Sequence, residues 1–590
     1  MTAPPAGGRS AGTVLEDALG DPDEAGRTAA AADAGELFPA EACGRLDEAG
    51  LAAHYVPAGH GGRLENHEEL LRLVRVVARR DLTAAVAHAK TYLGAAPVWV
   101  AADPEQARAV AAAVLAAAPV GWALSEPDHG ADLLNGSCVA VPHPGGYRLD
   151  GVKWPVNNAT RADLLTVLAR TGERGARGHS LFVFDKSTAR PGSWRALPKV
   201  LTHGIRGADI SGIEFTGADV PASARVGAEG TGVETVLRAL QLTRTMCASL
   251  SLGAGEHALR VTARFVAGRV IQRHPLIERP YHASVLGRAA AHLAAVEAAT
   301  IAACRGIHGL TPEMSVVSAV AKALAPTLVD ALLAELAELL GARSFLTGVH
   351  EHGAFQKLRR DHQVVAVFDG STPVNRAALI QQFPRLVRGW SERATDTDGL
   401  RETVRPGGPV RPLDPAALTL LSRRGCSVVQ SLPDLAASIS ASVTASAGVP
   451  AGLAEHARAL CDELGEVHTR MARVRPAARP AMVSYELAAA YELGFAGAAC
   501  LHLWAAGEEQ HRGEPLWEDG LWVRAALRAL RSRTATILRL PRPEPVQGDE
   551  YADEQLARVV ADAARTGAPV TPFGDPMPVP AGQGGDPGGR

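Results

Sequence analysis

The sequence predicts a mainly helical protein with a β domain in its middle, and two observations carry this expectation. The first is composition: 47% of the 590 residues are hydrophobic but only 4% are aromatic, and alanine, the strongest helix former, is the commonest residue by inspection. The second is order: apolar residues recur at helical spacing before and after a stretch of about 100 residues in which short β-type runs alternate with turns. Helices, then strands, then helices is not the strand–helix alternation of a doubly wound sheet.

Composition also excludes several classes of protein. Lys and Arg number 60 against 63 Asp and Glu, a formal charge of −3, so we expect no nucleic-acid partner. The seven cysteines are dispersed, with no C-x-x-C pair, which favours a reducing compartment over a disulfide framework or a cysteine-based zinc site. The start of the chain lacks the apolar core of a secretion signal, and the longest uncharged stretch, 109–124, is shorter than the roughly 20 residues that a bilayer needs. We therefore expect a cytoplasmic protein with no transmembrane segment and no metal site.

Changes in composition divide the chain into seven segments. They are a flexible tail (1–35), an N-terminal helical domain (36–118), a middle β domain (119–222), a C-terminal helical bundle (223–395), a linker (396–415), an additional helical domain (416–540) and a mostly disordered tail (541–590). Both tails are rich in Gly, Asp and Pro, and the linker is rich in Pro, Gly and Arg.

The elements follow from local patterns. Residues 68–77 carry apolar side chains at spacings of three and four, and 109–124 is typical of a buried helix that runs into a strand. In the β domain, alternation around Asp150-Gly151 predicts a hairpin, because Asp-Gly favours tight turns. Further β-type runs follow at 164–168, 180–184 and 213–215.

Helical patterns return in the last part of the chain. A wide apolar stripe between Leu328 and Leu340 ends at Gly341, as expected for one buried helix face. Residues 485–505 predict a long helix in the additional domain, and 553–565 predict a short helix in the C-terminal tail.

Several short motifs occur in a fixed order that is more specific than any one of them. They lie at 125–132, 151–158, 204–207, 220–221, Arg244, Arg269 with Pro275, 339–342, 357–361 and 368–371. In this order they resemble the acyl-CoA dehydrogenase family of flavoproteins, whose motifs include T/S-E-P-x-x-G-S-D, G-x-K-W/M, and K-L-x-R-D followed by Y-E-G-T. Residues 483–504 resemble the added helical bundle of very-long-chain acyl-CoA dehydrogenases and acyl-CoA oxidases.

The resemblance implies a fold and a reaction. The family has an N-terminal helical domain, a middle β barrel or sandwich and a C-terminal four-helix bundle, and it holds FAD that subunits of a homodimer or homotetramer usually share. It removes the α-proton of an acyl thioester with a carboxylate and transfers the β-hydride to flavin N5. The implied substrates are acyl-CoA or an acyl-carrier protein, within fatty acid metabolism, and the implied electron acceptors are an electron-transfer flavoprotein or oxygen.

The resemblance also assigns site residues. Asp369 takes the place of the catalytic base, and Arg244 that of the arginine at the start of the C-terminal domain. The implied cofactor contacts are Leu124, Ser125, Gly130, Ala131, Trp154, Asn157, Arg269, Gln272, Glu338, Gly341 and Ser371.

The chain departs from the family where chemistry is expected. Asp369 stands where the family has Glu, and Asp is shorter by one methylene. Ala131 replaces a Ser, and Pro155 and Gln272 replace aromatic residues. Asn157 replaces a Thr but can still donate a hydrogen bond, as Thr does. Three interpretations stay open: Asp369 is the base in an adjusted pocket; the protein is a flavin oxidase of the nitroalkane-oxidase or acyl-CoA-oxidase type; or it is a catalytically impaired binding or assembly subunit.

Overall fold

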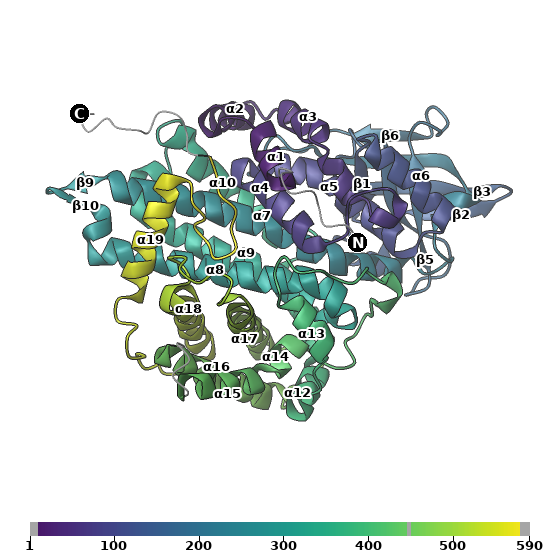
Figure 1. The fold of residues 1–590 in the computed structure, drawn as a ribbon. Coiled ribbons are helices and arrows are strands. Elements are labelled where there is room, and N and C mark those ends of the chain that lie inside the picture. The colour runs from purple at the N-terminus through teal and green to yellow at the C-terminus, as the bar shows by residue number, and fades with distance from the viewer. Residues whose placement is uncertain (1–9, 445–449, 579–590) are drawn as a thin grey trace. The chain divides into compact units, whose positions relative to one another are not determined.

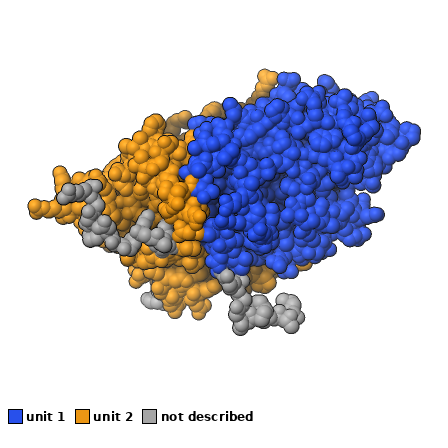
Figure 2. Space-filling model, turned by 90° about the horizontal axis from the view of Figure 1, so that it is seen from above, with its two compact units in different colours: residues 1–20, 28–243, 414–420 blue, residues 21–27, 244–413, 421–590 orange. Residues whose placement is uncertain are grey.

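The computed structural model describes residues 10–444 and 450–578 (Figure 1), which fall into two compact units (Figure 2). Within the described residues, unit 1 comprises 10–20, 28–243 and 414–420, and unit 2 comprises 21–27, 244–413 and 421–578. Helix α2 (Pro22–Ala34) and helix α7 (Gly232–Gly268) each contribute residues to both units.

Unit 1 begins with a helical part. Its other helices are α1 (Ala11–Ala18), α3 (Ala40–Glu48), α4 (His67–Arg80), α5 (Leu82–Ala101) and α6 (Pro104–Leu115). The apolar stripe expected at 68–77 is buried in α4, which starts where the Asn66 side chain accepts a hydrogen bond from the Glu68 N–H. The stretch 109–124 is the end of α6, a loop and strand β1 (Val120–Ala123), so the predicted order of helix and strand is confirmed. The helix is buried on one face only, because Leu115 is 41% exposed.

The prediction of a flexible tail is wrong for residues 11–34, because most of them are helical. Glu16 of α1 is 6% exposed and accepts hydrogen bonds from Arg79 Nε (2.8 Å) and Arg80 Nε (3.0 Å) of α4. Leu15 and Leu19 are also buried. A buried carboxylate held by two arginines and two buried leucines therefore fix a segment whose composition alone indicates disorder.

The second part of unit 1 is an eight-stranded sheet. Its path is β6-β7-β3-β2-β4-β5-β8, with β1 paired in parallel to β4. The remaining strands are β2 (Val139–His143), β3 (Gly146–Asn157), β4 (Leu164–Arg170), β5 (His179–Asp185), β6 (Trp194–Leu197), β7 (Ile210–Pro221) and β8 (Arg225–Val226). Helix α5 packs against β1 so closely that a Cβ on Gly94 would lie 2.5 Å from the Val120 carbonyl oxygen.

The hairpin predicted at Asp150-Gly151 is wrong, because both residues lie inside β3. The turn falls earlier, where His143 of β2 pairs with Gly146 of β3. At Asp150 the register with β7 shifts, and Gly151 has a φ of +131°, with its missing Cβ 2.7 Å from the Cys138 Cα. Asp150-Gly151 therefore forms a bulge in a long strand and not a tight turn. Both structures require a residue that can adopt a positive φ, which is why the sequence pattern does not distinguish them.

Unit 2 is helical apart from a small hairpin, β9 (Val270–Ile271) and β10 (His274–Pro275). Its helices are α8 (Pro280–Gly309), α9 (Met314–Leu340), α10 (Ala354–His362), α11 (Thr372–Ile380), α12 (Phe383–Glu392), α13 (Thr397–Thr403), α14 (Ser427–Gln430), α15 (Leu432–Thr444), α16 (Ala451–Met471), α17 (Met482–Gly507), α18 (Leu521–Leu538) and α19 (Ala552–Thr566). Helix α8 packs against α9, α17, α18 and α19 (Figure 1). A Cβ on Gly287 of α8 would lie 1.9 Å from the Asp553 carbonyl oxygen, so a residue without a side chain permits the contact with α19.

Within the part of the chain that the structure describes, three helical stretches are long and apolar enough to cross a membrane, judged by length and composition: 280–309, 311–344 and 482–507. The expectation of no transmembrane segment is based on the longest uncharged stretch, 109–124, and does not take these three helical stretches into account. Their apolar windows are 94%, 83% and 100% buried within the structure. Packing against other helices therefore accounts for their apolar character in this fold.

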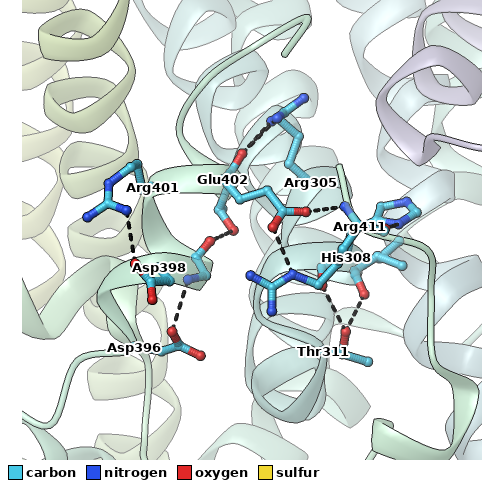
Figure 3. A network of polar contacts seen from close by, with 11 residues as sticks. Arg305, His308, Thr311, Asp396, Asp398, Arg401, Glu402 and Arg411 are labelled. Carbon is cyan, nitrogen blue, oxygen red and sulfur yellow. Dashed lines mark hydrogen bonds and ion pairs between the residues drawn. The ribbon is translucent and has the colours of Figure 1, made fainter. Parts of the chain in front are cut away.

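The segment expected as a linker is fixed by a polar network on α8 (Figure 3). Helix α13 occupies its first part, and the buried Arg305 donates hydrogen bonds to the Glu402 carbonyl (2.7 and 3.0 Å) and the Gly408 carbonyl (3.2 Å). Nδ1 of His308 contacts the Arg411 carbonyl at 2.9 Å. Side chains distant in sequence thus order a Pro- and Gly-rich stretch.

Replacing Arg305 with Met should release this segment. Each hydrogen bond from a charged donor contributes about 1.5–3 kcal/mol, so loss of several should raise the open population of 404–413 at least about tenfold. The measurement is the rate of cleavage at Arg405 and Arg411 by an arginine-specific protease. Arg401→Met, which removes an ion pair between exposed side chains, is the control; equal cleavage of both variants would contradict the prediction.

The C-terminal tail is also more ordered than expected. Helix α19 covers the predicted 553–565, and the following residues stay packed: Thr571 Oγ1 and the Phe573 N–H donate hydrogen bonds to the buried Glu297, at 3.1 and 3.2 Å. The Phe573 ring lies 5.3 Å from Trp517 and 5.7 Å from Trp522. The expectation of disorder is therefore wrong for 552–573, while its clearest part, 581–590, lies outside the described residues.

Candidate active site

The loop 124–126 and strand β3 of unit 1 are joined by a buried ion pair. Lys153 Nζ lies 2.8 Å from Glu126 Oε1, and the two residues are 2% and 3% exposed. Lys153 also donates to the Leu124 carbonyl (3.0 Å), and the Trp154 N–H donates to the Ser125 carbonyl (2.9 Å). The structure thus brings together three predicted cofactor residues from two motifs about 30 positions apart.

The Glu126 carboxylate is held in its ionised form. The Ser137 N–H and hydroxyl both donate to it at 2.6 Å, and the Cys138 N–H donates at 3.1 Å. Burial alone would raise the pKa of Glu126, but the charge and hydrogen bond of Lys153 and the bonds from Ser137 lower it to about 2. The loop is therefore fixed by a charge that persists throughout the physiological pH range.

Asn157, near the end of β3, is a polar group without a partner. Both polar atoms of its side chain are buried and make no hydrogen bond to any described residue. The same is true of Nε1 of Trp122 in β1, which sequence reasoning missed, although Trp122 is two residues before Leu124 and alternate strand residues share a face. Because buried polar groups nearly always have a partner, these donors and acceptors are available to a bound ligand or water. Gly130 and Ala131 lie exposed in the following loop.

Asp369 of unit 2 sits on a tight turn beside Arg244. Arg244 Nε donates to the Asp369 backbone carbonyl at 3.1 Å, and the Cys247 thiol lies 3.7 Å from Asp369 Oδ2. Asp369 and Gly370 have φ values of +54° and +89°, and a Cβ on Gly370 would lie 3.0 Å from Arg244 Nη2. Glycine therefore allows Arg244 to approach the backbone of the turn.

Arg244 is itself buried, 8% exposed. Burial lowers the pKa of its guanidinium, and the negative charge of Asp369 opposes that shift. The structure brings the two residues assigned to catalysis together, but the direct contact runs through the backbone of Asp369. Arg244 thus holds the turn through the backbone of Asp369.

Two more buried side chains hold the backbone at this turn and just before it, and sequence reasoning missed both. Asn375 of α11 donates to the carbonyls of Gly370 (2.8 Å) and Ser371 (3.1 Å). Lys322 of α9, fully buried, donates to the Val365 carbonyl at 2.5 Å. A charged residue inside an apolar helical run was the available signal for Lys322. Ser371, assigned to the cofactor, is the N-cap residue of α11 and makes no side-chain capping bond.

The other assigned cofactor residues, Arg269, Gln272, Glu338 and Gly341, are exposed. Gln272, with a φ of +54°, accepts a hydrogen bond from Arg279 (3.2 Å), and Glu338 accepts one from Tyr281 (3.2 Å). Arg269 and Gln272 lie at the β9–β10 hairpin, and Glu338 and Gly341 lie at the end of α9. The two hydrogen bonds come from residues at the start of α8.

Two family models match the chain. Residues 121–218 match the acyl-CoA dehydrogenase middle domain, and residues 230–383 match the acyl-CoA dehydrogenase C-terminal domain. The matched ranges contain both the ion pair of Lys153 and the turn at Asp369.

Similar proteins carry the same kind of name. The chain is 28% identical to a cyclohex-1-ene-1-carbonyl-CoA dehydrogenase of Geobacter metallireducens over 43% of this chain and 65% of that protein. It is 23% identical to a probable acyl-CoA dehydrogenase of Mycobacterium tuberculosis over 60% of this chain and 90% of that protein. Its fold is similar to the structure of an acyl-CoA dehydrogenase from Bacillus anthracis, complexed with FAD, with a TM-score of 0.67, 16% identity and 94% of each chain covered.

Proposed function

Because the chain carries the middle and C-terminal domains of the acyl-CoA dehydrogenase family, we propose that it is an FAD-dependent oxidoreductase that forms an α,β double bond in an acyl thioester. The observation that carries the proposal is the turn at Asp369. There a carboxylate is held through its backbone by the buried Arg244, inside a domain whose relatives are named dehydrogenases. We propose acyl-CoA or an acyl-carrier protein as substrate, an electron-transfer flavoprotein or oxygen as acceptor, and the cytoplasm as location.

The residues of unit 1 fit a flavin. The unpartnered amide of Asn157 offers both a donor and an acceptor, and the indole of Trp122 offers a second donor. Leu124, Ser125 and Trp154 lie beside the ion pair that fixes the loop and would complete the binding surface. When bound, FAD supplies the acceptor for the hydride. We assign the exposed Arg269, Gln272, Glu338 and Gly341 to the cofactor of a second copy in a homodimer or homotetramer.

Asp369 acts as the base in this proposal. Its carboxylate takes the α-proton, and the bond electrons left on the α-carbon form the double bond as hydride leaves the β-carbon. A base must lie within hydrogen-bond reach of that proton, so the Arg244 and Asn375 contacts serve to hold the turn still. Cys247 contacts this carboxylate, with its thiol 3.7 Å from Asp369 Oδ2.

The decisive experiment is an anaerobic titration. The purified protein should contain near-stoichiometric flavin, and a panel of acyl thioesters should include one that bleaches its absorbance. Colourless protein that takes up no FAD would contradict the proposal.

The shorter Asp369 side chain favours one second candidate, a flavin oxidase on the same scaffold. The two functions differ in the fate of the electrons. Peroxide release with oxygen as sole acceptor would select the oxidase, whereas bleaching without oxygen uptake would select the dehydrogenase.

Asn157→Leu should weaken FAD binding. Loss of hydrogen bonds at a buried position costs about 1–3 kcal/mol, which predicts a Kd for FAD about 10–100-fold higher. The measurement is flavin retention during dialysis and fluorescence titration of the apoprotein. Asn135→Leu, at an exposed position, is the control, and unchanged affinity in the Asn157 variant would remove Asn157 from the flavin site.

A further inference from the structure

Unit 2 contains a cavity of about 250 Å³ that lies outside the residues assigned to the reaction. Helices α9, α11, α17 and α18 form it, so the C-terminal bundle and the added helical domain each contribute walls. One of these helices, α11, begins directly after the turn at Asp369.

One side of the cavity is apolar. Leu324 and Leu328 of α9 and Leu493 of α17 are at most 3% exposed, and Ile537 of α18 completes the wall. Met482 also lines the cavity and is 73% exposed, next to Val483 at 53%. The apolar lining therefore continues onto the surface, as expected for a site that admits an apolar chain.

The other side carries two arginines and one buried carboxylate. Arg376 of α11 binds Glu492 through both carboxylate oxygens, at 3.0 and 2.9 Å, and Glu492 is 1% exposed. Arg376 and Glu492 therefore neutralise each other's charge. The second arginine, Arg533 of α18, lines the same cavity and makes no hydrogen bond or ion pair with any residue in the described part of the chain.

Arg533 is half-buried, so its guanidinium donors remain accessible to a ligand in the cavity. Burial lowers the pKa of its guanidinium; the charge of Glu335 opposes the shift and that of Arg376 adds to it. A partly buried guanidinium has five donors and gains most from a planar anion that it can bind through two of them. One free arginine, with Glu492 and Glu486 also in the lining, favours a singly charged head group over a doubly charged one.

We propose that this cavity is a binding site for a medium-chain carboxylic acid, with the carboxylate on Arg533 and the chain along the leucine wall. The volume lies below the roughly 300–1,000 Å³ of typical ligand pockets, which suits a single unbranched chain. The inference is independent of the proposed reaction, because it depends on none of the residues assigned to FAD or to proton transfer.

The test compares three probes that share one chain: octanoate, octan-1-ol and octyl phosphate, each titrated calorimetrically into the flavin-loaded protein. Octanoate should bind once per chain, and octan-1-ol and octyl phosphate at least about tenfold more weakly. Equal affinity for octan-1-ol would overturn the role of Arg533, and tighter binding of octyl phosphate would overturn the carboxylate head group.

Variants identify the site. Arg533→Met should weaken octanoate at least about tenfold and leave octan-1-ol unchanged, whereas Arg533→Lys, which keeps the charge but not the two parallel donors, should weaken octanoate less than Arg533→Met does. Ile537→Gln should weaken both probes. Arg542→Met, an exposed arginine outside the cavity, is the matched control. Circular dichroism melts confirm that each variant is folded, and octanoate binding unaffected in folded Arg533→Met would overturn the proposal.

Discussion

The Asp369→Asn variant should bleach its flavin about 10²–10⁴-fold more slowly than the parent protein when mixed anaerobically with an acyl thioester. An amide cannot accept the α-proton, whereas its size matches that of the carboxylate. Arg244 bonds to the backbone carbonyl of residue 369, so the substitution leaves that contact and the turn in place. The measurement is stopped-flow absorbance of the flavin, with flavin content checked beforehand.

A second variant separates the interpretations that the sequence leaves open. Asp369→Glu restores the longer side chain typical of the family, but in a pocket adjusted to Asp it would misplace the carboxylate by about 1 Å, which can cost on the order of 100-fold. Slower bleaching in both variants would support Asp369 as the base. Faster bleaching with Glu would indicate an impaired member, and full activity with Asn would exclude Asp369 as the base. Asp462→Asn, at an exposed position of α16 outside the assigned motifs, is the control.

The order of the elements could be predicted because hydrophobic periodicity is local. The stripe from Leu328 to Leu340 is buried in α9 as expected, and the strands fall between the two helical parts. The errors lie where distant contacts override composition: Glu16 meets Arg79, and Arg305 holds the Pro- and Gly-rich segment. No window of sequence contains both members of such contacts.

The candidate site could likewise be predicted only in part: residues within motifs were found, and isolated polar residues were missed. Motif order and spacing brought out Asp369 with Arg244, and the loop at Ser125 with Trp154, because these residues lie in motifs that resemble those of the acyl-CoA dehydrogenase family. Asn375, Lys322 and Trp122 were missed because each lies in an element whose apolar pattern hides one polar group. The structure identifies Asn375 and Lys322 by the carbonyls to which they donate, and Trp122 by the indole N–H that has no hydrogen-bond partner among the described residues.

The Lys153→Met variant should destabilise unit 1 by about 3–5 kcal/mol, because it leaves the Glu126 carboxylate buried without its opposite charge. The expected result is a lower melting temperature and loss of bound flavin, since the ion pair fixes the loop that carries Ser125. Arg195→Met removes the pair with Glu214, in which the arginine is exposed, and should cost at most about 1 kcal/mol. Melting followed by tryptophan fluorescence and by released flavin measures both effects.

The same pair predicts a pH dependence with a definite sign. The pKa of Glu126 falls from 4.5 in the unfolded chain to about 2 in the fold, so its contribution, on the order of 3 kcal/mol, is complete above pH 4.5 and is lost as the pH falls toward 2. In Lys153→Met the folded-state pKa rises, so this acid-dependent contribution should shrink. Lys153→Met combined with Glu126→Gln should recover part of the stability, because no buried charge is left without a partner. If the double variant were no more stable than Lys153→Met alone, the loss would come from packing of the lysine chain, and the ion pair would not be what joins the two motifs.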